Sequence, residues 1–235
     1  MQRSARGDGD IDIMAIKAAP PAVGCKDLSR DFEGRRALLP VSFSIEEGGH
    51  LVIQGPTGSG KTTLLRLLAG LLYPSTGHVL DGGIVVNRPG WRLPPHRRRI
   101  GMLFQGLALW PHMTVREQVE FSLPTEVFPA RPDRRRAADR VLADAGILPL
   151  APRLPRELSG GEKQRAAWAR AVAGEPRLLF LDEPLTSLDP LLREELLQAV
   201  IRYGQRPGTN IVLVTHDAQV AERLGYRILR LEKPG

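Results

Sequence analysis

Apolar residues recur along the chain in two periods, which together predict alternating strands and helices. Short apolar runs are typical of buried strands, and they occur at 50–54, 178–181 and 210–214. A leucine-rich segment after the first run has helical spacing, which predicts a helix over 62–72 that ends before Pro74. Alternation of this kind predicts an α/β fold with a largely parallel sheet.

The middle of the chain, from about 106 to 172, has a helical pattern with proline-rich breaks at 124–132 and 149–155. Because strand patterns flank this stretch, it predicts a helical lobe inserted into the α/β domain. Two further strands are predicted within 78–104, around a loop at 87–99.

The first residues lack an amphipathic period. We expect a disordered lead-in over 1–20 and a folded domain over 21–235. Met14 offers a second possible start of translation beside Met1. Short strands and turns are predicted from Val23 onward.

Length and composition bound the class of protein. A chain of 235 residues is long enough for one α/β domain with a smaller lobe. Its single cysteine, Cys25, excludes an intramolecular disulfide framework and fits a reducing compartment. No apolar run approaches the roughly 18 residues that span a bilayer, and the polar N-terminus lacks the apolar core of a signal peptide. We therefore expect a soluble, cytosolic protein.

The net charge of +7, from 33 Lys and Arg against 26 Asp and Glu, would permit contact with nucleic acid or a membrane surface. However, the arginine clusters at 97–99 and 134–136 lie apart in the sequence, and neither cluster has aromatic residues interleaved with its arginines. We interpret both clusters as solvated faces and expect no nucleic-acid partner.

A glycine-rich segment, Gly55–Thr62 (GPTGSGKT), follows the first apolar run, precedes the predicted helix and fits the pattern G-x-x-x-x-G-K-[ST]. Its glycines let the backbone curl so that successive N–H groups point at a phosphate, and the helix start adds the positive end of its dipole. Lys61 is placed to reach the β- and γ-phosphates, and Thr62 offers a hydroxyl to Mg²⁺. The segment predicts a nucleotide site.

Two carboxylates, Asp182 and Glu183, follow another predicted strand. Ligand sites in parallel sheets lie at the carboxyl ends of the strands, where the glycine-rich segment is also expected. Asp182 would then hold Mg²⁺, directly or through water, and Glu183 would polarise the attacking water as a general base.

A second anion cradle is predicted at Leu158–Arg165 (LSGGEKQR). Ser159 can cap the helix that starts there, and the N–H groups of Gly160 and Gly161 face outward. One nucleotide does not need two phosphate cradles from one chain. We therefore expect this cradle to close on a nucleotide held by a second subunit.

These motifs resemble those of ATP-binding cassette (ABC) ATPase subunits, and the resemblance extends from residue 23 to about 230. The segment GPTGSGKT is similar to the Walker A motif, and LLFLDE at 178–183 is similar to the Walker B motif. LSGGEKQR is similar to the family signature, with Glu162 where glutamine is commoner.

Single residues extend the resemblance. Gln105 matches the Q-loop glutamine, Ser187–Asp189 the D-loop, and His216 the switch histidine, which can reach a γ-phosphate. Phe32 matches the aromatic residue that stacks on adenine, although a lone phenylalanine is often simply part of a core or surface.

The resemblance implies a Mg²⁺-dependent ATPase site. Glu183, His216, Lys61 and Gln105 would be catalytic, and Thr62, Gln105 and Asp182 would hold the metal. The residues that would bind ATP are Phe32, Gly55, Pro56, Thr57, Gly58, Ser59, Gly60, Lys61, Thr62, Thr63, Ser159, Gly160, Gly161 and Asp189.

It further implies a P-loop NTPase fold: a RecA-like core with a mostly parallel sheet, an N-terminal antiparallel β-subdomain and an inserted α-helical subdomain. In this family two ATPase subunits, identical or different, clamp two ATP molecules and drive the permease subunits from the inner face of the cell membrane. A solute-binding protein outside the cell would be a further partner through the permease.

The stretch 107–121 (LALWPHMTVREQVEF) resembles importer ATPases for small nutrients or ions, and it would face the permease. Leu109, Trp110 and Met113 would supply apolar anchors, or Trp110 would instead pack the helical lobe. Many importer ATPases carry a further regulatory β-domain. The end at Gly235 favours the short type, similar to ATPases for thiamine or other anions and vitamins.

Two other functions compete with the transporter. An ABC ATPase acting on soluble machinery, such as ribosomes, DNA repair or assembly factors, is the alternative, but the chain shows one cassette without a coiled-coil insertion or zinc module. A phosphate-binding regulator without turnover would require the loss of Glu183 or His216, and both are present. The cargo would be selected by the permease, and only 107–121 favours import over export.

Overall fold

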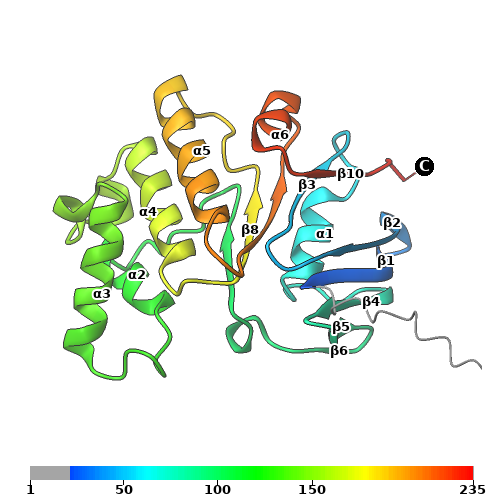
Figure 1. Ribbon diagram of the computed structural model, residues 1–235, viewed down its shortest axis with the longest axis horizontal. Coiled ribbons are helices and arrows are strands. Elements are labelled where there is room, and N and C mark those ends of the chain that lie inside the picture. The colour runs from blue at the N-terminus through cyan, green and yellow to red at the C-terminus, as the bar shows by residue number, and fades with distance from the viewer. Residues whose placement is uncertain (1–21, 235) are drawn as a thin grey trace, which may run out of the picture.

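A sheet of five parallel strands, in the order β10-β3-β9-β8-β7, runs through the centre of this computed structural model, which describes residues 22–234 (Figure 1). Its strands are β3 (His50–Gln54), β7 (Ile100–Leu103), β8 (Leu178–Asp182), β9 (Asn210–Val214) and β10 (Arg227–Arg230). Every residue of β8 and β9 is buried, because both faces of the sheet are covered. The predicted parallel sheet is confirmed.

Different helices cover the two faces. Leu51 and Ile53 pack into one core with α1 (Lys61–Leu68), whereas Val52 between them packs into another core on the opposite face. The alternation follows from strand geometry, in which successive side chains point to opposite faces. The helices of the opposite face are α4 (Gly160–Val172), α5 (Pro190–Gly204) and α6 (Ala218–Leu224).

A second sheet of five antiparallel strands, in the order β2-β1-β4-β5-β6, lies on the far side of α1 (Figure 1). Its strands are β1 (Val23–Phe32), β2 (Arg35–Ile45), β4 (Thr76–Asp81), β5 (Ile84–Arg88) and β6 (Trp91–Arg92). Both sheets and α1 contribute to one apolar core, which contains Leu38, Val79, Leu64 and Phe180. The antiparallel subdomain expected from the resemblance is therefore present.

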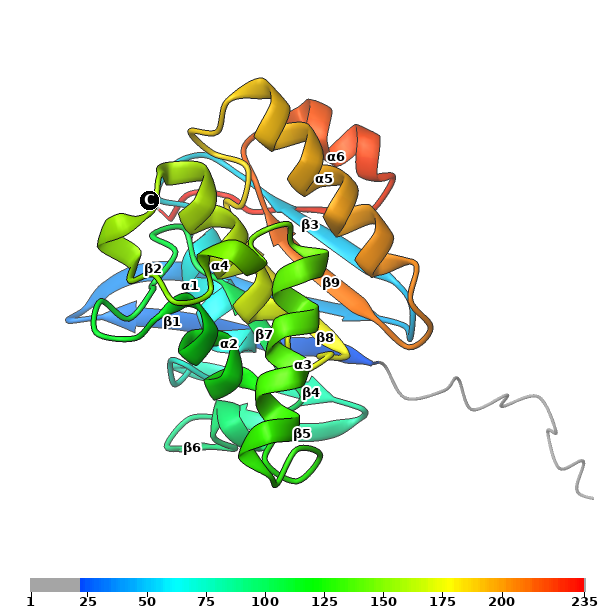
Figure 2. The ribbon, with the colours of Figure 1, turned by 90° about the vertical axis from the view of Figure 1, so that its left-hand side faces the viewer.

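Helices α2 (Val115–Ser122), α3 (Arg131–Asp144) and α4 lie between β7 and β8 in the chain and form the inserted helical lobe (Figure 2). The lobe has a core of its own, to which Ala166 and Ala169 of α4 belong. Ala167 and Ala171 of the same helix pack into the core on the parallel sheet, so α4 joins the lobe to the sheet. Three short 3-10 turns complete the structure: η1 (Pro95–Arg97), η2 (Leu148–Leu150) and η3 (Pro155–Glu157).

Two local predictions were wrong. The helix expected over 62–72 ends at Leu68, because Gly70 adopts a φ of 73° and turns the chain. Four strands replace the two expected within 78–104, because a tight turn divides β4 from β5, and the end of β5 and the two-residue β6 lie in the loop expected at 87–99. The lead-in expected over 1–20 lies outside the described residues.

Within the described part of the chain, none of the helices combines the length and the apolar character needed to cross a bilayer.

Asn87 connects the antiparallel sheet to the end of α1. Its side chain is fully buried, and Nδ2 donates to the carbonyl oxygens of Leu67 (2.7 Å) and Leu72 (2.8 Å). Asn87→Ala removes the donor from both carbonyls, so we expect the free energy of unfolding to fall by about 1–3 kcal/mol. Urea denaturation followed by circular dichroism measures this change. An unchanged midpoint and slope would contradict the role given to Asn87.

Candidate active site

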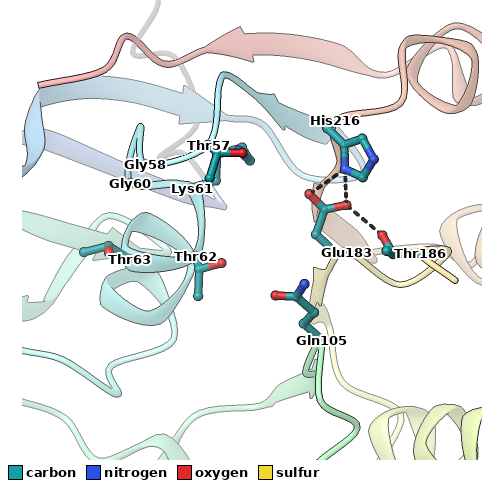
Figure 3. A pocket seen from close by; sticks show the side chains of 10 residues that line it. All are labelled: Thr57, Gly58, Gly60, Lys61, Thr62, Thr63, Gln105, Glu183, Thr186 and His216. Carbon is teal, nitrogen blue, oxygen red and sulfur yellow. Dashed lines mark hydrogen bonds and ion pairs between the residues drawn. The ribbon is translucent and has the colours of Figure 1, made fainter.

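Four of the parallel strands deliver side chains to one edge of the sheet. The glycine-rich loop follows β3, Gln105 follows β7, Asp182 ends β8 and His216 follows β9. The loop, Gln105 and His216 line an open cavity of about 430 Å³, in which the loop faces Glu183 and His216 (Figure 3). The cavity is lined by Thr57, Gly58, Gly60, Lys61, Thr62, Thr63, Gln105, Glu183, Thr186 and His216.

The glycine-rich loop requires glycine for two separate reasons. A Cβ atom at Gly60 would lie 2.4 Å from the carbonyl oxygen of Ala37, and the residue also adopts a φ of 90°. At Gly55 a Cβ atom would lie 2.6 Å from the carbonyl oxygen of Leu231. The neighbouring backbone therefore fixes the path of the loop.

The loop presents positive charge to the cavity. Gly60 is the N-cap of α1 and has no side chain to accept from the first N–H groups of the helix, which leaves them for an anion. The Lys61 ammonium donates to the carbonyl oxygens of Gly55 (2.8 Å) and Pro56 (3.1 Å), so its charge is held at the loop. This combination of a helix start and an ammonium suits a polyphosphate.

Thr62, which lines the cavity, contacts Asp182, although 120 positions separate them in the sequence. The Thr62 hydroxyl donates to Oδ1 of Asp182 at 2.9 Å, and Asp182 is only 1% exposed. Burial raises the pKa of the Asp182 carboxyl, and the hydrogen bond from Thr62 lowers it in part.

This pair fits Mg²⁺ in its chemistry. A hydroxyl and a carboxylate are hard oxygen ligands, and Mg²⁺ in nucleotide sites takes one or two carboxylates together with phosphates and water. Residues 22–234 contain no group of three or more His, Cys, Asp or Glu that would form an all-protein metal cage. The donor set therefore suits a metal ion that arrives with a nucleotide.

Glu183 is held in a strained position. Its φ is 49°, in the left-handed region that residues with a side chain rarely adopt, and its N–H donates to the carbonyl oxygen of Val214 at 3.0 Å. Nδ1 of His216 lies 3.1 and 3.0 Å from the two carboxylate oxygens. The Thr186 hydroxyl donates to Oε2 at 3.0 Å (Figure 3).

Thr186 was missed by the sequence analysis. It lies between the Walker B-like and D-loop-like segments, and no spacing rule marks a threonine there. Its signal is structural: it lines the cavity and contacts the carboxylate of Glu183.

Some predicted site residues lie outside the cavity lining. Ser159 caps α4 by accepting from the N–H of Glu162, whose carboxylate accepts from the N–H of Ser159 at 2.7 Å. Asp189 caps α5 by accepting from the N–H of Leu192 at 3.0 Å. Phe32 is 42% exposed and carries the Arg30 guanidinium 4.5 Å above its ring centre. The nucleotide-binding roles of these residues stay predictions.

The chain resembles known proteins along most of its length. A family model described as ABC transporter matches residues 38–186, more than half of the chain. The chain is 38% identical to the putrescine transport ATP-binding protein PotG of Escherichia coli (strain K12), over 90% of this chain and 55% of that protein. It is 40% identical to the Fe(3+) ions import ATP-binding protein FbpC 1 of Rhizobium meliloti (strain 1021), over 90% of this chain and 58% of that protein. The chain thus spans little more than half the length of these relatives.

Solved structures agree with this resemblance. A dimeric structure of MJ0796, a bacterial ABC transporter cassette, matches with a TM-score of 0.78 and 33% identity, covering 89% of this chain and 94% of that chain. A dimeric post-hydrolysis state of MJ0796, bound to ADP and Pi, matches with a TM-score of 0.77 and the same 33% identity, covering 90% and 96%.

Because the Asp182 carboxyl is buried, replacing it with a neutral side chain should raise the thermal stability of the fold by an amount that depends on pH. Because the folded-state pKa is raised, the ionised carboxylate destabilises the fold once the pH exceeds the unfolded value of about 3.9. In Asp182→Asn the side-chain oxygen can still accept the hydrogen bond from Thr62. We therefore expect this variant to have a higher melting temperature than the wild type at pH 7, and the difference to close toward pH 3. Thermal unfolding across this range measures the difference. A variant with a lower melting temperature than the wild type at every pH would show that the ionised Asp182 carboxylate does not destabilise the fold.

Proposed function

This chain belongs to the ABC transporter family, and on that premise we propose that it is the ATP-binding and ATP-hydrolysing subunit of an ABC importer. The observation that carries the proposal is the cavity in which the glycine-rich loop and Lys61 face Glu183 and His216. The family match and the two curated relatives, both named as ATP-binding transport proteins, support it.

Binding follows from the loop. The N–H groups of Gly58, Gly60 and the first residues of α1 receive the phosphates of ATP, and the Lys61 ammonium turns from the loop carbonyls to the β- and γ-phosphates. The face of the Phe32 ring opposite Arg30 stacks on the adenine.

The residues that face the glycine-rich loop across the cavity carry out hydrolysis. Glu183 accepts a proton from a water molecule whose oxygen attacks the γ-phosphorus, while the bond from that phosphorus to the bridging oxygen of ADP breaks. His216, within hydrogen-bond distance of Glu183, orients the carboxylate and reaches the γ-phosphate. The Thr186 hydroxyl donates to Oε2 of Glu183 and so helps to orient the same carboxylate.

Thr62, Asp182 and Gln105 would hold Mg²⁺, which would neutralise the negative charge that develops on the phosphates. With the metal bound, the Thr62 hydroxyl would give up its hydrogen bond to Asp182 and offer its oxygen as a ligand. Gln105 lies at the start of the segment that leads into the helical lobe, so it would connect the metal site to that lobe.

Two copies of the chain complete two sites. Ser159, Gly160 and Gly161 do not line the cavity of their own chain. The N–H groups of Gly160 and Gly161, at the start of α4, therefore serve the nucleotide of a second subunit. The dimeric form of the related cassette MJ0796 supports this arrangement.

The segment 107–121 is the proposed contact with the permease, which places the chain at the inner face of the cell membrane. Here the exposures differ from those expected: Leu109, Trp110 and Met113 are half-buried, whereas Phe121 is 68% exposed. Trp110 packs edge-on against Phe121, with ring centres 5.0 Å apart. Trp110 therefore supports the lobe, and Phe121 supplies the apolar anchor. The names of the relatives favour transport over the soluble machinery considered as the alternative.

Lys61→Ala tests the phosphate site. The substitution removes the main protein cation that opposes transition-state charge on the phosphoryl group, so we expect ATP turnover to fall by about 10³-fold or more. Phosphate release from the purified chain measures turnover, and circular dichroism checks the fold. A kcat equal to that of the wild type would contradict the phosphate site.

Glu183→Gln tests the transporter. This variant should bind ATP but hydrolyse it very slowly, and so keep its complex with the permease. We expect a tagged Glu183→Gln chain, with ATP, to capture a multispan membrane protein from detergent-solubilised membranes of its source cell, identified by mass spectrometry. Recovery of soluble partners alone, with no chain in the membrane fraction, would favour the soluble-machinery alternative.

A further inference from the structure

The backbone turns sharply just after Gln105. The N–H of Ala108 donates to the carbonyl oxygen of Gly106 at 2.6 Å, which closes a three-residue turn around Leu107. Leu107 has a φ of 59° and Ala108 a φ of 48°. Two consecutive residues with side chains in the left-handed region are costly, so other contacts must hold them there.

Arg170 supplies those contacts. Its guanidinium donates from Nη2 to the carbonyl oxygen of Leu107 at 2.7 Å and from Nη1 to that of Ala108. The residue is only 7% exposed, and its Cζ lies 5.0 Å from the centre of the Trp110 ring. Among the ion pairs within residues 22–234, none includes Arg170. The turn is thus the main polar partner of a buried cation.

Arg170 lies on α4, the helix that begins at the Ser159 cradle. A second buried side chain of α4, Gln164, donates to the carbonyl oxygen of Pro184 at 2.7 Å, one residue after Glu183. The same helix therefore holds the two loops that carry Gln105 and Glu183. Because α4 packs on both the lobe and the sheet, it connects these loops to both cores.

We propose that Arg170 is a positioning residue for ATP hydrolysis, which holds the left-handed turn and thereby places Gln105 at the cavity. The inference rests on the ATPase function proposed above. It gives α4 a second role: contact of the Ser159 cradle with the nucleotide of another subunit is transmitted through Arg170 to the Q-loop of its own chain.

Arg170→Lys in the full chain is the direct test. Lysine keeps the charge but has no planar fork, so it cannot bond two carbonyls in a fixed geometry. We expect hydrogen exchange of the amides in 105–113 to accelerate at least about tenfold. We also expect kcat for Mg-ATP to fall about tenfold or more while KM stays within about twofold, because positioning is lost and not binding.

Arg223→Lys is the matched control. Arg223 on α6 makes a forked pair with Glu194 at 2.7 Å for both contacts, but this pair is on the surface and far along the chain from the turn. The same chemical change there should leave exchange in 105–113 and kcat at wild-type values.

Ala108→Val tests the same turn by changing the loop and not the arginine, and it replaces Arg170→Lys if that variant does not fold. A β-branched residue is disfavoured at a φ of 48°, so this substitution at an exposed position should open the turn with Arg170 intact. We expect the same local rise in exchange and the same fall in kcat.

Three results would overturn the inference: unchanged exchange in 105–113, a normal kcat, or exchange that rises equally throughout the buried core of α3. The last result would show a purely structural role. A wild-type chain without ATP turnover would contradict the proposed function instead, and the exchange measurement would still show whether Arg170 holds the turn.

Discussion

The site depends on one constraint, the common edge at which parallel strands end. Residues far apart in the chain meet there because β8 and β9 are buried along their whole length and cannot shift against β3. Backbone hydrogen bonds between neighbouring strands extend past the strand ends into the loops: the N–H of Glu183 donates to the carbonyl oxygen of Val214, and the N–H of Thr215 donates to that of Ile53. The sheet thus places the glycine-rich loop and the carboxylates without help from a ligand.

Strain is concentrated in the loops around this edge. Leu107, Ala108, Glu183 and Ser187 all adopt positive φ values, although none is glycine. Such conformations persist only where the surroundings determine them. Helix α4 holds Leu107 and Ala108 through Arg170, and it contacts the loop after Glu183 through Gln164. The same helix begins at the proposed cradle for a second subunit and carries the buried polar side chains that contact both loops.

The sequence predicted the features whose signal is local. Gly55–Thr62 and the carboxylates after 178–181 could be found because residue type, spacing and flanking periodicity all lie within a few positions. Thr186 and Arg170 could not be found, since their importance comes from contacts that no local pattern marks; the partners of Arg170 are 62 and 63 positions away. Trp110 was only partly predicted, because its burial depends on Phe121 and on Arg170 from another helix.

The central claim is that the cavity of one copy is completed by the Ser159 cradle of another when ATP is bound. Light scattering of the purified Glu183→Gln chain, with and without Mg-ATP, measures this most directly. The account predicts a monomer without nucleotide and a dimer with it, and a return to monomer when Ser159→Arg is added to block the cradle. A chain that stays monomeric with saturating Mg-ATP, or that dimerises equally with Ser159→Arg, would contradict the account.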